Sequence, residues 1–337
     1  MAQPYASRRV TRTDVARHAG VSTAVVSYVV NNGPRTVAPE TAARVREAME
    51  TLEYRPNLSA RALVSGTSNT LGLIVTDSLN PHCAELAQAI GQAAAQHGHR
   101  VLVVDSGGVD ETEQGLVEEL LARQVDGLLF ASAFLRSDPM AGIRSFGVPT
   151  VLIDCPGEVP GRTTVGPAAE QGMAALVEHL SGVHGCRRIA LILGEGGFGD
   201  PDPRETGWRR TATSLGLDEG PLLVTQWGNA GGYQAGLELL AMDARPDAVI
   251  AGSDQIAIGL LRALHEASVR VPEDLPVVSF DGTHQSAYTW PALTVASQPV
   301  SPMAEAAVAL LGDAPLAPGH HSFPMTLIVR RSCGCTA

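Results

Sequence analysis

The stretch that decides the fold of the N-terminal region is Thr11-Arg-Thr-Asp-Val-Ala-Arg-His-Ala-Gly-Val-Ser-Thr-Ala-Val-Val-Ser-Tyr-Val-Val-Asn31. Its small and apolar residues recur at helical spacing on both sides of Gly20. Before the glycine, the residues on one helical face are Val15, Ala16 and Ala19. After it they are Val21, Val25, Val26 and Val29. Two short helices with small residues at their contact and a Gly turn between them predict a helix-turn-helix, which can place one helix in a DNA groove.

The ends of these helices carry capping residues. Thr11 with Asp14 three residues later resembles a capping box, and Ser22 stands where the second helix needs an N-cap. Pro39 falls at the first position of a third predicted helix. The apolar stripe of that helix is Val45, Ala48, Met49 and Leu52. We expect the third helix to brace the other two.

Composition separates the N-terminal region from the rest of the chain. The 337 residues carry a net charge of -11, yet residues 1–66 hold nine Arg against five acidic residues. All 24 cationic residues are Arg, which we attribute to coding bias. A basic head on an acidic body is typical of a nucleic-acid-binding protein. The sequence contains no apolar run long enough for a membrane span and no signal-peptide core, so we expect a cytoplasmic protein without a membrane partner.

The cysteines are Cys83, Cys155, Cys186, Cys333 and Cys335, an odd and scattered set that argues against a disulfide framework. Cys333-Gly-Cys335 with His320-His321 nearby is a possible metal-ligand set. The spacing lacks a second CxxC-type pair, so the favoured interpretation is a reduced C-terminal tail. We therefore predict no metal, no cofactor and no catalytic residue, since the sequence shows no phosphate loop, carboxylate pair or Ser-His-Asp arrangement.

After the turn-rich linker Ser65-Gly66-Thr67-Ser68, apolar strands alternate with helices. The predicted strands are Leu71–Val75, Arg100–Asp105, Gly127–Ala131, Thr150–Asp154, Arg188–Leu193, Ala248–Gly252 and Pro276–Phe280. The predicted helices between them include Cys83–Gln96, Thr112–Arg123, Glu170–Leu180, Arg204–Leu215, Tyr233–Met242 and Gln255–Ala267. Strands that are apolar throughout and alternate with helices indicate parallel sheets covered on both faces. The length of this region suits two α/β lobes better than one.

The motifs of the chain resemble those of the lactose-repressor and galactose-repressor family of bacterial transcription regulators. In the head they are Asp14-Val-Ala16, Ala19-Gly-Val-Ser22, Val26-Ser27, Asn31, Tyr54-Arg-Pro-Asn57 and Ala60-Arg-Ala-Leu63. In the rest they include Leu71-Gly-Leu-Ile-Val75, Asn80-Pro81, Val148-Pro-Thr-Val-Leu-Ile-Asp154, Ser253-Asp254-Gln-Ile-Ala-Ile-Gly259, Phe280-Asp281 and Gln298. The resemblance covers nearly the whole chain.

The resemblance implies an all-α helix-turn-helix head over residues 8–56, a hinge helix and linker over 57–67, and an effector-binding and dimerisation domain over 68–337. That domain resembles a periplasmic binding protein with two lobes of parallel sheet. The first lobe would take residues 68–163 and 297–322, and the second 164–296 and 323–332, with crossover strands near residues 163, 296 and 322.

For the head, the resemblance implies that the helix beginning at Ser22 enters the major groove. The implied DNA contacts are Thr11, Ser22, Thr23, Ala24, Ser27, Tyr28, Asn31, Asn57, Ala60 and Leu63. Many relatives carry Arg where this chain has Tyr28, so the half-site read here is expected to differ, unless Tyr28 only packs on the third helix. Leu63 matches a leucine that wedges into the central base step, the alternative being the last apolar residue of a linker helix.

For the rest of the chain, the resemblance implies effector contacts from Asp154, Arg204, Trp227, Ser253, Asp281 and Gln298. A guanidinium and a carboxylate together can hold adjacent hydroxyls of a sugar, and a Trp can stack on a sugar face. For Arg204 or Asp281 alone, a surface salt bridge is the alternative. Ser253 replaces an amide or acid that relatives often carry, and His82 with Cys83 replaces an aromatic pair. We assign His82 and Cys83 to packing or solvent exposure at a helix start.

The predicted function is sequence-specific, effector-controlled transcription regulation, in the sense of a repressor binding double-stranded DNA at a near-palindromic operator. We expect a homodimer, because one short helix gives too few contacts and two heads can read two half-sites. Because only five residues follow Ser332, we expect no tetramerising helix. The rival classes are a solute-binding protein of sugar import, which would lack the DNA-binding head, and an enzyme, which would need a catalytic constellation.

Overall fold

The computed structural model describes residues 10–31, 36–55, 66–131, 148–155, 157–196, 202–312 and 316–336. The chain divides into two compact units, residues 1–68 and residues 69–337, which we call the head and the body. The hinge residues Asn57, Ala60 and Leu63 lie outside the described residues.

The head consists of three helices, α1 (Arg12–Ala19), α2 (Thr23–Asn31) and α3 (Pro39–Thr51). The predicted capping box is confirmed, because Thr11 Oγ1 accepts from the Asp14 N–H and the Asp14 carboxylate accepts from the Thr11 N–H at 3.0 Å. Gly20 ends α1 in the left-handed conformation, with φ of 66°, as the predicted turn requires. The buried core of the head is Val15, Ala16, Ala19, Val26, Val45 and Ala48.

The first sheet of the body has strand order β11-β5-β4-β3-β1-β2, with every pair parallel. Its strands are β1 (Thr70–Val75), β2 (Arg100–Asp105), β3 (Gly127–Ala131), β4 (Thr150–Ile153), β5 (Thr163–Pro167) and β11 (Gly319–Phe323). Helices α5 (Pro81–Gln96) and α11 (Val300–Gly312) pack on one face, and α6 (Asp110–Ala122) packs on the other. Alternation along β1 shows why: Leu73 points to α5 and α11, and Ile74 points to α6.

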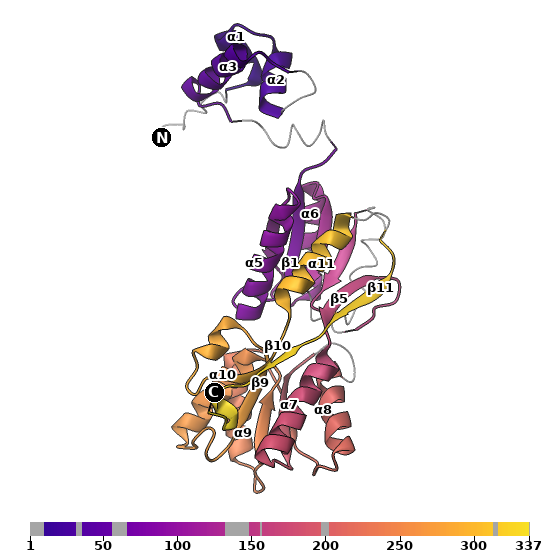
Figure 1. Ribbon diagram of the computed structural model, residues 1–337, viewed down its shortest axis with the longest axis vertical. Helices are drawn as coiled ribbons and strands as arrows, with labels where there is room; N and C mark the ends of the chain where they lie inside the picture. The colour runs from indigo at the N-terminus through magenta and orange to yellow at the C-terminus, as the bar shows by residue number, and fades with distance from the viewer. Residues whose placement is uncertain are drawn as a thin grey trace. The chain divides into compact units, whose positions relative to one another are not determined.

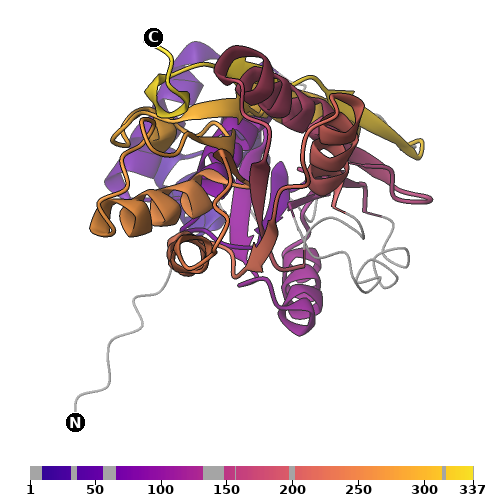
Figure 2. The same ribbon diagram turned by 90° about the horizontal axis from the view of Figure 1, so that it is seen from below.

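The second sheet has order β12-β10-β9-β8-β6-β7, parallel except for the β10–β12 pair. Its strands are β6 (Ile189–Gly194), β7 (Leu222–Thr225), β8 (Ala248–Ala251), β9 (Val277–Asp281), β10 (Thr294–Ser297) and β12 (Thr326–Ile328). Its helices are α7 (Ala169–His184) and α8 (Pro203–Ser214) on one face, with α9 (Asn229–Leu240) and α10 (Asp254–Glu266) on the other. Figure 2 shows helices on both sides of the strands, the two-faced cover that the apolar strands predict.

The chain passes between the two sheets three times, after β5, after β10 and after β11. The strand β5 pairs with β4 and β11 and begins at Thr163, where the first crossover strand is expected, and the chain leaves the first sheet after Pro167. Figure 1 shows β10 and β11 running through the region between the lobes of the body. This topology brings the carboxyl ends of strands from both sheets towards the same space, where ligands bind in open α/β sheets.

Candidate functional site

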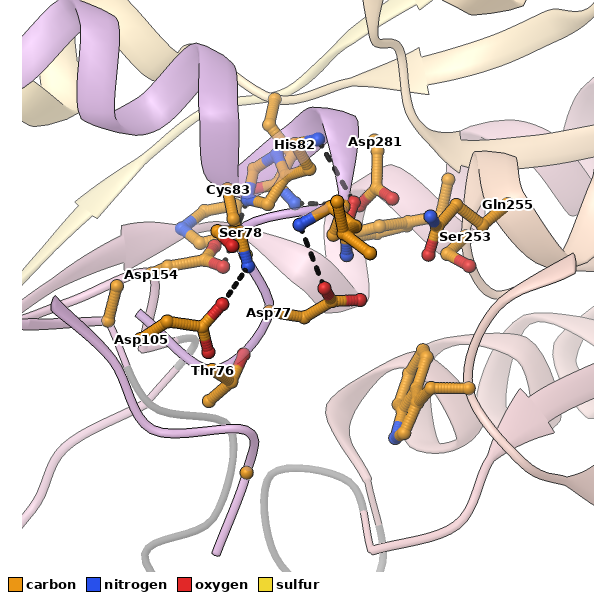
Figure 3. Close-up of a pocket in the computed structure, with 18 of the residues that line it drawn as sticks. Thr76, Asp77, Ser78, His82, Cys83, Asp105, Asp154, Ser253, Gln255 and Asp281 are labelled. Carbon is orange, nitrogen blue, oxygen red and sulfur yellow. Dashed lines mark hydrogen bonds and ion pairs between the residues drawn. The ribbon is translucent and has the colours of Figure 1, made fainter. Parts of the chain in front are cut away.

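A cavity of about 660 Å³ lies between the two lobes of the body and is lined from both sheets. The first lobe contributes the segment after β1 (Thr76 to Asn80), the start of α5, and the ends of β2 and β4. The second contributes the start of α8, the segment after β7, and the ends of β8, β9 and β10. Figure 3 shows Asp105 and Asp154 on one side of this cavity and Ser253, Gln255 and Asp281 on the other. We call it the cleft; its volume suits a small ligand.

The structure brings all six residues assigned to effector contact in the sequence into this one cleft. They are Asp154, Arg204, Trp227, Ser253, Asp281 and Gln298. Arg204, Ser253 and Asp281 are buried, and the others are partly buried. Residues more than 140 positions apart thus line one cavity because each follows a strand end or begins a helix at the same edge.

Arg204 is held by Asp202, a residue that the sequence analysis did not single out. Arg204 Nε and Nη2 donate to the two oxygens of Asp202 at 2.9 and 2.8 Å, and Nη1 donates to the Gly252 carbonyl at 3.0 Å. Asp202 is also the N-cap of α8. Burial by itself would lower the pKa of Arg204, but the Asp202 carboxylate raises it above the usual value. The guanidinium is therefore a fixed cation on the wall of the cleft.

His82 is the second residue whose role the sequence analysis missed. It is buried at the start of α5, and its Nε2 lies 2.9 Å from Asp154 Oδ2. Burial alone would lower the pKa of His82, but the charge and hydrogen bond of Asp154 outweigh it, with smaller contributions from Asp281 and Asp254, and raise the pKa to about 10. His82 is thus an imidazolium ion at neutral pH. The sequence offered one signal for this role. His82 follows Pro81 and Asn80, the N-cap of a helix, close to the end of a parallel strand.

Cys83, beside it, is buried, and burial followed by the nearby Asp154 charge raises its pKa to about 12. It is a neutral thiol at neutral pH and packs in the core of the first lobe. The expected packing role therefore fits Cys83 but not His82.

Asp281 ends β9 in a left-handed conformation, with φ of 102°, and faces the cleft. Its Oδ1 accepts from Gln298 Nε2 at 2.9 Å. Burial raises the pKa of Asp281 to about 7, although the charge of His82 lowers it. Gln298 Oε1 is buried and has no hydrogen-bond partner among the residues that the structure describes. A buried acceptor without a partner is unfavourable, so this oxygen is ready to receive a donor from a ligand.

Trp227 lies against the backbone of Gly194, where an added Cβ would stand 2.1 Å from a ring atom. Its indole N–H donates to the Glu195 carbonyl at 2.8 Å, and the Arg204 guanidinium carbon lies 4.9 Å from the ring centroid. The ring is thus positioned by a glycine, a backbone acceptor and a cation–π contact.

In the head, the residues assigned to DNA contact that the structure describes lie at the start of α1 and along α2. Thr11, Ser22, Thr23 and Ala24 are exposed, and Ser27 and Tyr28 are partly buried. The Ser22 hydroxyl accepts from the Val25 N–H at 3.4 Å, so Ser22 is the predicted N-cap. Asn31 ends α2, and its side chain is outside the described part of the chain.

A three-helix head with an exposed helix start, joined to a two-lobed body with a ligand-sized cleft, defines a ligand-responsive DNA-binding protein. The family described as "Bacterial regulatory proteins, lacI family" matches residues 11–57. The "Periplasmic binding protein-like domain" family matches residues 177–333.

Relatives match over nearly the whole chain. Catabolite control protein A of Priestia megaterium is 32% identical over 90% of this chain and 91% of its own length. The ribose operon repressor of Escherichia coli K12 is 30% identical over 89% of this chain and 92% of its own length. Among solved structures, the lac repressor dimer bound to operator and the anti-inducer ONPF is similar with a TM-score of 0.85 at 28% identity, covering 97% of this chain and 99% of that one.

The chain belongs to the lacI family of bacterial regulatory proteins. It is a DNA-binding transcription regulator with a periplasmic-binding-protein-like effector domain, as the sequence analysis predicts. The matches include the head, which separates the chain from the solute-binding class, and the relatives are regulators rather than enzymes. No described helix is both long and apolar enough to span a membrane.

Proposed function

We propose that the cleft binds a neutral, polyhydroxylated small molecule, a sugar or sugar derivative, and that its occupancy sets the affinity of a repressor for its operator. The observation that carries this proposal is Gln298 Oε1, which is buried beside Asp281 without a hydrogen-bond partner in the described part of the chain, in a cleft lined by two fixed cations and several carboxylates. Hydroxyl groups both donate and accept hydrogen bonds, so they can pair with the cationic donors and with the carboxylate and amide acceptors of the cleft.

The charges of the cleft favour a neutral ligand over an anionic one. The two cations, His82 and Arg204, are each paired with a carboxylate, Asp154 and Asp202. Asp77, Asp105 and Asp281 also line the cleft. A phosphate or carboxylate ligand would have to compete with carboxylates already in place, and it would meet further negative charge around them. A neutral sugar, or one bearing an amine, avoids this repulsion.

In the head, we propose that α2 enters the major groove and that Tyr28 faces DNA rather than the core. The partly buried side chains that pack on the head core include Val25, Val29 and Tyr54, and within the described residues Tyr28 is not among them. A tyrosine cannot make the bidentate contact with guanine that Arg makes, so its half-site should depart from that of Arg-bearing relatives. The hinge contacts of Asn57, Ala60 and Leu63 remain part of this proposal.

We propose that the working unit is a homodimer on a near-palindromic operator. One three-helix head presents few base contacts, and a two-fold pair of heads reads two half-sites. The similar lac repressor binds its operator as a dimer. The coupling would then follow from differential binding: the effector shifts the protein only if it binds one arrangement of the lobes more tightly than the other.

The test is calorimetric titration of the full-length protein with a panel of neutral sugars, amino sugars and sugar phosphates, followed by operator-binding curves with and without each ligand. For the ligand that binds, Gln298→Leu should weaken affinity about tenfold, the size of one lost hydrogen bond. The matched control is Gln96→Leu, at an exposed site near the end of α5 remote from the cleft. Tightest binding by sugar phosphates, or equal affinity in both variants, would contradict the proposal.

A further inference from the structure

Two cysteines at the C-terminal end of the chain face two histidines of α7. They are Cys333, Cys335, His179 and His184, and their ligand atoms all lie within 4.8 Å of one another. His179 Nε2 is 3.3 Å from Cys333 Sγ and 3.8 Å from Cys335 Sγ, and His184 Nε2 is 3.5 Å from Cys335 Sγ. Cys333 is fully buried, and the other three side chains are partly buried. None of these four residues lines the effector cleft.

The fold holds the cysteines in place through the residues around them. The Ser332 hydroxyl accepts from the Thr294 N–H at 2.8 Å, and the Ser332 N–H donates to the Ala292 carbonyl at 3.0 Å. Gly334 between the cysteines has φ of 109°, and an added Cβ would lie 3.2 Å from the His184 ring. The left-handed backbone favours a glycine here, and a larger residue would crowd the His184 ring.

The histidines are also arranged by their helix. His179 and His184 lie in the last turns of α7, with ring centroids 5.1 Å apart in an edge-to-face arrangement. The start of α7 lines the effector cleft through Ala169. Fifteen residues of helical rise separate Ala169 from His184, about 22 Å, so the cluster is a separate site.

The histidines beside these cysteines in space are His179 and His184, not His320 and His321, which stand nearest to them in the sequence. His320 and His321 lie on β11 in the first sheet, and His320 Nδ1 is 2.8 Å from Thr164 Oγ1. Cys333 packs in the core of the second lobe, on α7. His320 and His321 are close to the cysteines in sequence but not in space, because the chain crosses from the first sheet to the second between Phe323 and Thr326.

We propose that His179, His184, Cys333 and Cys335 form a four-coordinate Zn²⁺ site that fastens the C-terminal segment to α7. Bond lengths of about 2.0–2.1 Å to nitrogen and about 2.3 Å to sulfur place tetrahedral ligand atoms roughly 3.3–3.8 Å apart. The three contacts of 3.3–3.8 Å between these residues already match that spacing. Two thiolates and two imidazoles favour Zn²⁺ among the common divalent ions.

The chemistry of the site is structural. Four protein ligands close the coordination shell and leave no open position for water or substrate. Binding converts two thiols to thiolates, so each Zn²⁺ that enters releases up to two protons. The Thr294 hydroxyl, 3.1 Å from Cys333 Sγ, can donate to the buried thiolate as an outer-shell partner.

The experiment uses full-length protein that has been reduced and stripped with a chelator, then titrated with Zn²⁺ and, for spectroscopy, Co²⁺. The wild type should bind one Zn²⁺ per chain and give the visible bands and thiolate charge-transfer absorption of tetrahedral Co²⁺. Cys335→Ser and His184→Gln should each weaken Zn²⁺ affinity more than about a hundredfold, since loss of a ligand exceeds the loss of an outer-shell partner. Both replaced side chains are partly exposed, so these variants should fold, as circular dichroism will show.

The matched controls are Cys155→Ser, a buried cysteine of the first lobe, and His321→Gln, the exposed histidine that the sequence pointed to. Both should bind Zn²⁺ like the wild type. The proposal is overturned if the reduced wild type binds no stoichiometric Zn²⁺ or if the controls lose affinity as strongly as Cys335→Ser. It is equally overturned if mass spectrometry finds a Cys333–Cys335 disulfide and reduction restores no metal binding.

Discussion

Replacing Arg204 by Ala should destabilise the body strongly, quite apart from any effect on ligand binding. The side chains of Arg204 and Asp202 are each only 7% exposed and are joined by two hydrogen bonds. Removing one partner of a buried pair leaves the other charge uncompensated, which costs about 3–5 kcal/mol. We therefore expect Arg204→Ala to lose this much of the free energy of unfolding of the body.

The size of the effect on melting temperature follows from the length of the body. At about 2.1 cal/mol/K per residue, roughly 270 residues have an unfolding entropy of about 0.57 kcal/mol/K, so the loss lowers the melting temperature by about 5–9 °C. All three tryptophans, Trp208, Trp227 and Trp290, lie in the body. Thermal unfolding followed by tryptophan fluorescence therefore reports the body alone.

Two further variants separate the buried pair from other effects. Asp202→Asn keeps an N-cap oxygen for α8 and removes the uncompensated charge, so Arg204→Ala with Asp202→Asn should melt several degrees above Arg204→Ala alone. The control, Arg123→Ala, breaks an exposed pair with Glu119 and should cost about 0.2–1 kcal/mol at most. If Arg204→Ala melts like Arg123→Ala, or if the double variant recovers nothing, the buried pair does not stabilise the body as we argue.

Three other outcomes are expected. Because the pKa of His82 is raised to about 10, the stability that His82 contributes is complete below about pH 6.5 and declines as the pH rises towards 10. Between pH 7 and pH 9, the free energy of unfolding measured by denaturation should therefore fall less for His82→Gln than for the wild type. Equal falls would refute the ion pair with Asp154. Tyr28→Arg should shift the half-site chosen from a random DNA pool towards guanine and leave the steep salt dependence of binding in place, whereas an unchanged preference would favour packing of Tyr28. Gly194→Ala should displace the Trp227 ring, since the added Cβ would overlap ring atoms. Calorimetry should then show weaker effector binding, with operator affinity in the absence of ligand unchanged. Effector affinity equal to that of the wild type would show that this ring position is not needed.

The local features of this chain are readable in the sequence because neighbouring residues determine them. The capping box of Thr11 and Asp14, the turn at Gly20 and the start of α3 at Pro39 depend on side chains within four positions of one another. Seven strands of the body, β1 to β4, β6, β8 and β9, are also found, since continuous apolar runs mark buried parallel strands. The strands β5, β10 and β11 were expected only from the resemblance. The strands β7 (Leu222–Thr225) and β12 (Thr326–Ile328) were not predicted, because they are short edge strands with few buried residues. The helix α11 was also not predicted, although its buried residues follow helical spacing.

The six cleft residues were assigned by resemblance, and resemblance carries over only positions that match a known pattern. His82 departs from that pattern, and its charge comes from Asp154, 72 positions away, so no local rule gives its pKa. The grouping of Cys333 and Cys335 with His179 and His184 likewise needs the chain to cross between sheets and return to α7. The sequence by itself determined the head helices and most helices and parallel strands of the body, because periodicity and capping act over a few residues. Its resemblance to a known family determined the class of the protein. Only the tertiary structure decided which charged side chains meet, and which histidines lie beside Cys333 and Cys335, because burial and electrostatic coupling depend on distances in space.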